Sequence, residues 1–191
     1  MSQGKDILTL VQNIQKLNAE IAALIKTCDK MFSHGKFPPD ESESKAVVRD
    51  SSASLDLPQR WTPTRMCRIY KNAGDKDDVI VLNIVLDSHN HPEAFDEPLV
   101  LCARFGYQKG QANQCSGWWD ARDLWVYKAA TETNRVYTKK ELNLDPDKFL
   151  APSEWQKREV DAMRDIRFLA VPLATLVDQK VLDEKVIRRM L

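Results

Sequence analysis

The chain has 191 residues, of which 43% are hydrophobic and 29% are charged. This composition is typical of a folded chain with a sizeable core and excludes general disorder. Lysine plus arginine and aspartate plus glutamate number 28 each. The chain therefore lacks the net positive charge that is typical of proteins that coat nucleic acid or anionic lipid. Its charge does not indicate a nucleic-acid partner.

No segment predicts a membrane span or an export signal. The longest apolar run has 8 residues from Val79 and is interrupted by Asn83, whereas roughly 20 residues are needed to cross a bilayer as a helix. Near the N-terminus, Lys5 and Asp6 precede a stretch that never becomes a continuous apolar leader. We therefore expect a soluble, cytoplasmic protein.

The cysteines are widely spaced and form no C-x-x-C pair. Such residues usually behave as small buried hydrophobes in a reducing compartment. They are Cys28, Cys67, Cys102 and Cys115.

The clearest periodic signal lies in residues 1–35. Isoleucine and leucine dominate the a and d positions of four successive heptads, a pattern typical of a coiled-coil helix. The seam consists of Ile7, Leu10, Ile14, Leu17, Ile21, Leu24, Cys28 and Met31. We expect the helix to end where Gly35 can adopt a left-handed cap and Pro38 and Pro39 cannot continue the helix.

Two interpretations of this helix compete. It either packs on its own domain, or it pairs with a second copy or with a helical partner. The regular alternation of isoleucine and leucine favours pairing, whereas Val11, Ile25 and Phe32 at e positions make the apolar stripe wider than a two-stranded seam requires.

The chain is predicted to have three parts: the heptad helix over residues 1–35, a linker over 36–60 and an α+β body over 61–191. The linker is rich in serine, acidic residues and proline, and it contains few large apolar residues. Such a segment buries too little surface to offset the entropy of ordering it.

In the body, the periodicity changes to that of strands. Alternating or continuous apolar runs begin at Met66, Val79, Leu99 and Leu124, and their connections are too short for crossover helices. We therefore predict an antiparallel meander of four strands, the last of them over residues 124–129.

The C-terminal region is predicted to contain two helices and one further strand. A helix is expected to begin at Ser153, an edge strand to contain Pro172, and a final helix to begin with Asp178 as its N-cap. The predicted fold class is α+β, with an antiparallel sheet of about four to five strands.

Asp87, His89 and His91 alternate along the chain, so in an extended segment their side chains project from one side. Imidazole and carboxylate groups suit zinc or another divalent ion, which would make this segment the centre of a metal-dependent hydrolase or nuclease. The competing interpretation, which we favour, is a solvated loop between two strands that needs no cofactor.

Trp118, Trp119 and Arg122 form a second candidate surface. Tryptophan pairs beside arginine bind nucleotides or single-stranded nucleic acid by stacking, although packing against the core is the more frequent role.

The sequence contains no convincing catalytic constellation, and its strongest feature is the heptad seam. We therefore predict a non-enzymatic subunit that assembles through its N-terminal helix, as a homo-oligomer or with a helical protein partner. Its α+β body would present a recognition surface.

Overall fold

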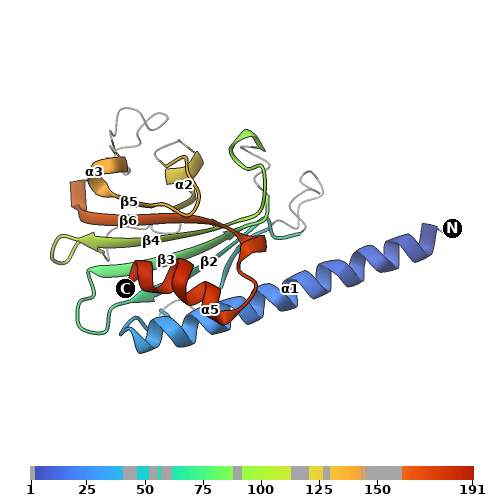
Figure 1. Cartoon of the computed structure of the whole chain (residues 1–191), viewed down its shortest axis with the longest axis horizontal. Helices are drawn as coiled ribbons and strands as arrows, with labels where there is room; N and C mark the ends of the chain where they lie inside the picture. The colour runs from blue at the N-terminus through green and yellow to red at the C-terminus, as the bar shows by residue number, and fades with distance from the viewer. Residues whose placement is uncertain are drawn as a thin grey trace.

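The computed structural model of the chain describes residues 3–40, 47–51, 56, 62–87, 92–112, 121–126, 130–142, 144 and 161–191. These residues form one antiparallel sheet with helices on both of its faces (Figure 1). A long helix begins the chain and a helical segment ends it. The predicted α+β class is confirmed.

The sheet contains six strands in the order β1-β2-β3-β4-β6-β5, and each neighbouring pair is antiparallel. The strands are β1 Val48–Asp50, β2 Arg65–Lys71, β3 Asp78–Val85, β4 Leu99–Tyr107, β5 Val136–Thr138 and β6 Met163–Pro172. The predicted meander is confirmed for β2, β3 and β4, which follow one another in both sequence and space.

The strand predicted for residues 124–129 is wrong. Leu124 to Val126 belong to helix α2 (Ala121–Val126), where Leu124 and Val126 are buried. An apolar run this short cannot distinguish a strand from a buried helical turn by its periodicity. Residues 127–129 lie outside the described part of the chain.

The predicted edge strand is an interior strand. β6 pairs with β4 along its whole length and with the short β5 on its other side. Proline is tolerated because Pro172 is the last residue of β6, opposite Leu99. β6 also begins at Met163, within the stretch where a helix from Ser153 was expected; residues 151–160 lie outside the described part.

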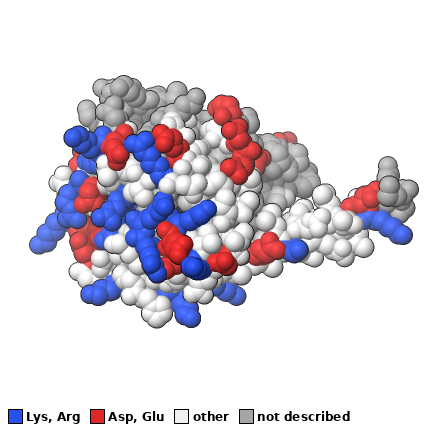
Figure 2. Space-filling model, viewed as in Figure 1, with Lys and Arg blue, Asp and Glu red and all other residues white. Residues whose placement is uncertain are grey.

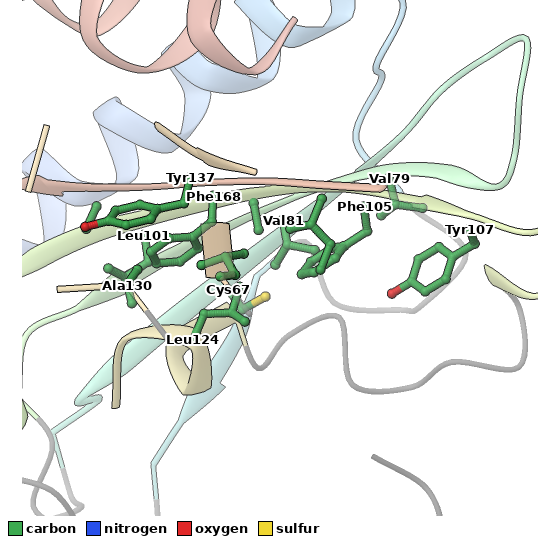
Figure 3. Close-up of a cluster of buried hydrophobic side chains, with 14 of the residues drawn as sticks. Cys67, Val79, Val81, Leu101, Phe105, Tyr107, Leu124, Ala130, Tyr137 and Phe168 are labelled. Carbon is green, nitrogen blue, oxygen red and sulfur yellow. The ribbon is translucent and has the colours of Figure 1, made fainter. Parts of the chain in front are cut away.

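Both faces of the sheet are buried. β3 is buried at every position, because alternate side chains enter two separate cores. One core contains Val79, Val81, Leu101 and Phe168, and Figure 3 shows these side chains on one side of the sheet, together with Leu124 of α2.

The second core lies between the sheet and two helical segments. The first is α1 (Gln3–His34), and the second is the continuous C-terminal segment α5 (Gln179–Leu182), η6 (Asp183–Ile187) and α6 (Arg188–Met190), in which η6 has π-helical geometry. As predicted, Asp178 is the N-cap of α5: its Oδ1 accepts a hydrogen bond of 2.8 Å from the Val181 N–H. Shorter elements are the helix α3 (Lys139–Leu142) and the 3-10 turns η2 (Pro92–Ala94) and η5 (Leu173–Thr175).

Gly35 follows α1, but its role differs from the predicted left-handed cap. Lys36 has the positive φ, of 71°. A Cβ at Gly35 would lie 2.4 Å from Leu191 Cδ2, so glycine allows the side chain of Leu191 to pack closely against this turn.

The segment after α1 is hydrogen-bonded to β2. The Asp40 N–H donates to Ile69 O at 2.8 Å, the Lys71 N–H donates to Pro38 O at 3.1 Å, and Lys71 and Asp40 form an ion pair at 2.7 Å. These contacts attach the C-terminal end of α1 to the sheet.

Candidate functional site: the arm of α1 and the adjacent groove

Helix α1 has two halves with different surroundings. In the C-terminal half, which we call the anchor (residues 21–34), Ile21, Ile25, Cys28 and Phe32 are buried in the core beneath the sheet. In heptad terms the deepest residues occupy a and e positions, while Leu24 and Met31 at d are only partly buried. The anchor therefore packs on its own body, which supports one of the two interpretations of the sequence.

The N-terminal half, which we call the arm (residues 4–20), projects beyond the sheet (Figure 1). Seven large hydrophobic side chains are exposed among the described residues, and five of them lie on the arm. These five are Ile7 (64% exposed), Leu8 (57%), Leu10 (63%), Val11 (45%) and Leu17 (38%). Figure 2 shows the projecting segment largely white, with charged groups concentrated near its tip and its base.

The arm has few internal contacts that would stabilise it alone. The Thr9 hydroxyl donates to Lys5 O at 2.9 Å, and Lys16 and Glu20 form an i,i+4 pair at 3.9 Å with both side chains well exposed. Such a pair contributes about 0.3–0.5 kcal/mol. The arm is only slightly longer than the roughly 12–15 residues below which isolated helices are marginal in water. It therefore gains stability from its attachment to the anchor and from any partner that covers it.

A groove of about 710 Å³ runs along one flank of α1, beside β1 and β2. From the helix it is lined by Asn18, Ile21, Ala22, Ile25, Lys26 and Asp29, and from the opposite wall by Val47, Ser51, Pro63, Met66 and Arg68. It starts where the arm meets the anchor, so the groove and the exposed stripe form one continuous surface.

The floor of the groove is held by an ion pair between α1 and β2. Arg68 is 6% exposed, and its Nε and Nη2 donate to Asp29 Oδ1 and Oδ2, both at 3.0 Å. This bidentate geometry fixes both planar groups and attaches the anchor to the sheet. The groove therefore has a preformed wall and floor.

The thiols of Cys28 and Cys102, in the core beneath α1, are not suited to nucleophilic chemistry. Cys28, Cys67 and Cys102 are buried and form no disulfide, in agreement with the sequence prediction for these three residues. Burial, with a smaller contribution from the charge of Asp29, raises the pKa of the Cys28 thiol to about 12. Burial also raises the pKa of Cys102. A thiol that stays protonated at neutral pH is a poor nucleophile and metal ligand.

The predicted metal segment is only partly described. Asp87 is exposed at the end of β3 and its N–H donates to Thr64 O at 3.3 Å, whereas His89 and His91 lie outside the described residues. Within the ranges that the structure describes, no three His, Cys, Asp or Glu side chains form a group that could hold a metal ion. The Asp87, His89 and His91 site stays a prediction.

The predicted tryptophan surface also stays a prediction. Trp118 and Trp119 lie outside the described residues, and only the backbone of Arg122 is described, within α2. Trp125 is partly buried against the core, and its Nε1–H donates to Ala94 O at 2.7 Å. α2 therefore places Trp125 in a packing role.

Comparisons with known proteins identify no relative. No protein-family model matches the chain, and neither the curated proteins nor the solved structures contain a match. Among the described residues, no helix is both long and apolar enough to cross a membrane.

Sequence patterns predicted α1 but not the groove. Leu8 is outside the a/d seam, so its exposure on the same side as Val11 had no role in the heptad prediction. Part of the opposite wall, Val47 and Ser51, comes from the segment that was predicted to be a linker. Only an excess of apolar residues at e positions indicated that α1 uses more than one face.

Proposed function

We propose that this chain is a self-associating subunit whose arm pairs with a second copy of the same chain. The anchor holds α1 on the sheet, and the α+β body is the part that assembly brings together. The observation that carries the proposal is the row of exposed apolar side chains on a helix that leaves its own core. Contiguous exposed apolar surface of this kind usually marks an interaction site.

The charge pattern of the arm supports burial of one side. Lys5, Asp6, Lys16 and Glu20 are the charged residues of the arm, and at about 100° per residue they fall within an arc of about 100°. Ile7, Leu8 and Val11 lie on the opposite side of the helix, and Leu10 and Leu17 lie beside one border of the charged arc. A helix that is solvated on all sides is not expected to separate its charged and apolar residues in this way.

The apolar residues also supply a reasonable driving force. Full burial of a leucine or isoleucine side chain contributes about 1.5–3 kcal/mol, and the five exposed side chains are about half exposed already. Across two copies the gain is on the order of 10 kcal/mol, which is comparable to the 4–15 kcal/mol lost on association. We therefore expect the oligomer to dissociate on dilution.

The test is the solution mass of the full chain by light scattering and sedimentation over a wide range of concentrations. The informative variant is Ile7→Asp combined with Leu10→Asp, which places two charges on the apolar side of the arm. The matched control is Thr9→Asp combined with Gln12→Asp, which adds the same charges to exposed positions on the other side.

We expect the unsubstituted chain and the control to be oligomeric and the Ile7/Leu10 variant to be monomeric with an unchanged fold. A full chain that remains monomeric at every concentration would contradict self-association and would leave a different helical protein as the partner. An oligomer that persists in the Ile7/Leu10 variant would show that another surface is responsible.

A further inference from the structure

The position of each residue around α1 gives the orientation of this assembly. At about 100° per residue, four apolar residues of the arm fall within an arc of about 120°. They are Ile7, Leu8, Val11 and Ile14. Five residues of the groove wall fall within the same arc further along the helix. They are Asn18, Ala22, Ile25, Lys26 and Asp29.

The arm stripe and the groove therefore share one face of a single helix. In the arm this face projects from the body, and in the anchor it forms one wall of the groove. The arm side chains on this face, from Ile7 to Ile14, extend over about 10 Å, and the helical wall of the groove from Asn18 to Asp29 extends over about 17 Å. The apolar stripe of one arm therefore fits within the length of the groove, which begins one turn after the stripe ends.

In a parallel pair of α1 helices, the arm of one copy would not reach the groove of the other. In a parallel pair each arm faces the arm of the other copy, and from Ile21 onward the a/d seam turns into each chain's own core, so neither groove is used. The contact would then be limited to about 15 Å of helix, fewer than three turns. It would also leave Leu8 outside the a/d seam.

We infer that two copies associate with their α1 helices antiparallel, each arm lying in the groove between α1 and the β1–β2 edge of the other copy. This inference rests on the proposed self-association and specifies its geometry. A two-fold axis near Asn18 places Ile14 of each copy opposite the exposed Ala22 of the other, and Val11 at the level of Ile25, which is 6% exposed. The paired region extends from Ile7 to Asp29, about 33 Å, twice the length that a parallel pair allows.

We infer that a second copy occupies the groove because the arm stripe and the groove lie on the same helix, on either side of Asn18. A two-fold axis near Asn18 therefore superimposes the arm of one copy on the groove of the other. A two-fold operation brings each arm into the groove of the other copy, so the assembly closes as a dimer and leaves neither groove empty. The groove also suits the arm chemically. Ala22, Ile25, Val47 and Met66 give it apolar walls, whereas the ion pair of Arg68 with Asp29 is already satisfied within the chain.

Cross-linking of cysteine variants distinguishes the two orientations. The variants Leu8→Cys and Lys26→Cys are made in separate chains of different mass and then mixed. In an antiparallel pair their two thiols lie on the same flank of the helix pair, about two residues apart along the helix axis. A short bismaleimide should then link the two different chains. In a parallel pair these positions are about 27 Å apart along the helix and should not react.

Ile7→Cys alone provides the opposite signal. Position 7 faces its own equivalent in a parallel pair, whereas in the antiparallel pair the two equivalents lie about 33 Å apart. The unsubstituted chain, which contains the four native cysteines, is the blank for both reactions.

A second measurement uses Ala22→Arg, which fills the groove, with Ala23→Arg as its matched control. Both alanines are exposed on α1, and only Ala22 lines the groove. We expect Ala22→Arg to raise the dimer dissociation constant at least about tenfold by sedimentation equilibrium and Ala23→Arg to leave it unchanged, because a buried, unpaired charge is costly to accommodate.

Each outcome has a distinct meaning. Linkage of the mixed Leu8 and Lys26 variants, with the selective effect at Ala22, supports the antiparallel dimer. Self-linkage of the Ile7 variant, or a dimer in which the mixed pair does not react, overturns this geometry while self-association stands. A chain that is monomeric at every concentration overturns both proposals.

Discussion

At the scale of single residues, Arg104 of β4 binds the last residues of the chain and attaches them to the sheet. Its guanidinium forms an ion pair with Asp78 at 2.7 Å and donates to the main-chain oxygens of Met190 at 2.9 Å and Leu191 at 2.7 Å. It also stacks on Phe37, with 4.8 Å between Cζ and the ring centroid. One side chain of β4 thereby connects the turn after α1, the strand β3 and the C-terminal helix.

The carboxyl group of Asp78 is held in its charged form. Burial alone would raise the pKa of Asp78, but hydrogen bonds from Arg104 and Asn72, together with the positive charge of Arg104, lower it below its ordinary value of 3.8. A carboxyl group whose pKa is lowered by folding stabilises the protein above its unfolded-state pKa. That contribution is lost as the pH falls through the lower, folded-state pKa.

We predict that Asp78→Asn lowers the free energy of unfolding by about 2 kcal/mol at neutral pH, because it leaves Arg104 without its charged partner. As the pH falls below 3.8 and through the lowered pKa of Asp78, the difference from the unsubstituted chain should shrink, since both then lack the charge. Urea unfolding across this pH range is the measurement, with the exposed Asp96→Asn as control. A difference that stays constant with pH would show that the charge of Asp78 does not matter.

At the scale of elements, α1 combines a core helix with an exposed helix. The change occurs near Ile21, where the sheet ends beneath the helix. The anchor is stabilised by apolar burial and by the bidentate pair of Arg68 with Asp29. The arm is not stabilised by such contacts with its own chain. Replacing a large side chain by alanine should therefore lower the free energy of unfolding in the anchor and change it little in the arm.

We predict that Ile25→Ala lowers the free energy of unfolding by about 2–5 kcal/mol, since it leaves a cavity at a position that is 6% exposed. Leu10→Ala should change it by less than about 0.5 kcal/mol at protein concentrations where the chain is monomeric. Urea denaturation of both variants at low concentration tests this. A large effect of Leu10→Ala under those conditions would place the arm in the fold of its own chain.

The element scale also shows where sequence patterns were sufficient. β2, β3 and β4 were predicted because β-branched residues, alternation and turn residues agree with one another in that region. α2 was missed because six residues carry too little periodicity, and β6 was assigned to an edge because its proline was assumed to interrupt the ladder. The structure places Pro172 at the end of the strand, where its missing N–H does no harm.

At the scale of the whole molecule, α1 is needed for the fold and also extends beyond it. The sheet is covered on one face by the anchor and the C-terminal helical segment, and on the other by α2 and α3 among the described elements (Figure 1). Removing the arm should therefore leave both cores intact, whereas removing all of α1 should open one of them.

We predict that a chain beginning at Asn18 is a folded monomer, because it keeps Ile21, Ile25, Cys28 and Phe32. A chain beginning at Leu57 should aggregate, because it exposes the sheet face that these residues cover. Circular dichroism, amide hydrogen exchange and light scattering on both chains test this. A folded monomer from Leu57 would contradict the structural role of the anchor.

The sequence by itself determined that a long apolar-striped helix begins the chain and that short-range antiparallel strands follow it. Heptad spacing and strand alternation are local properties, set by the side chains of neighbouring residues. Only the tertiary structure decided which part of that stripe is buried, because burial depends on where the sheet ends and not on the repeat. The groove is likewise decided only in three dimensions, since its two walls lie far apart in the sequence and meet through the pairing of β1 with β2 and of Asp29 with Arg68.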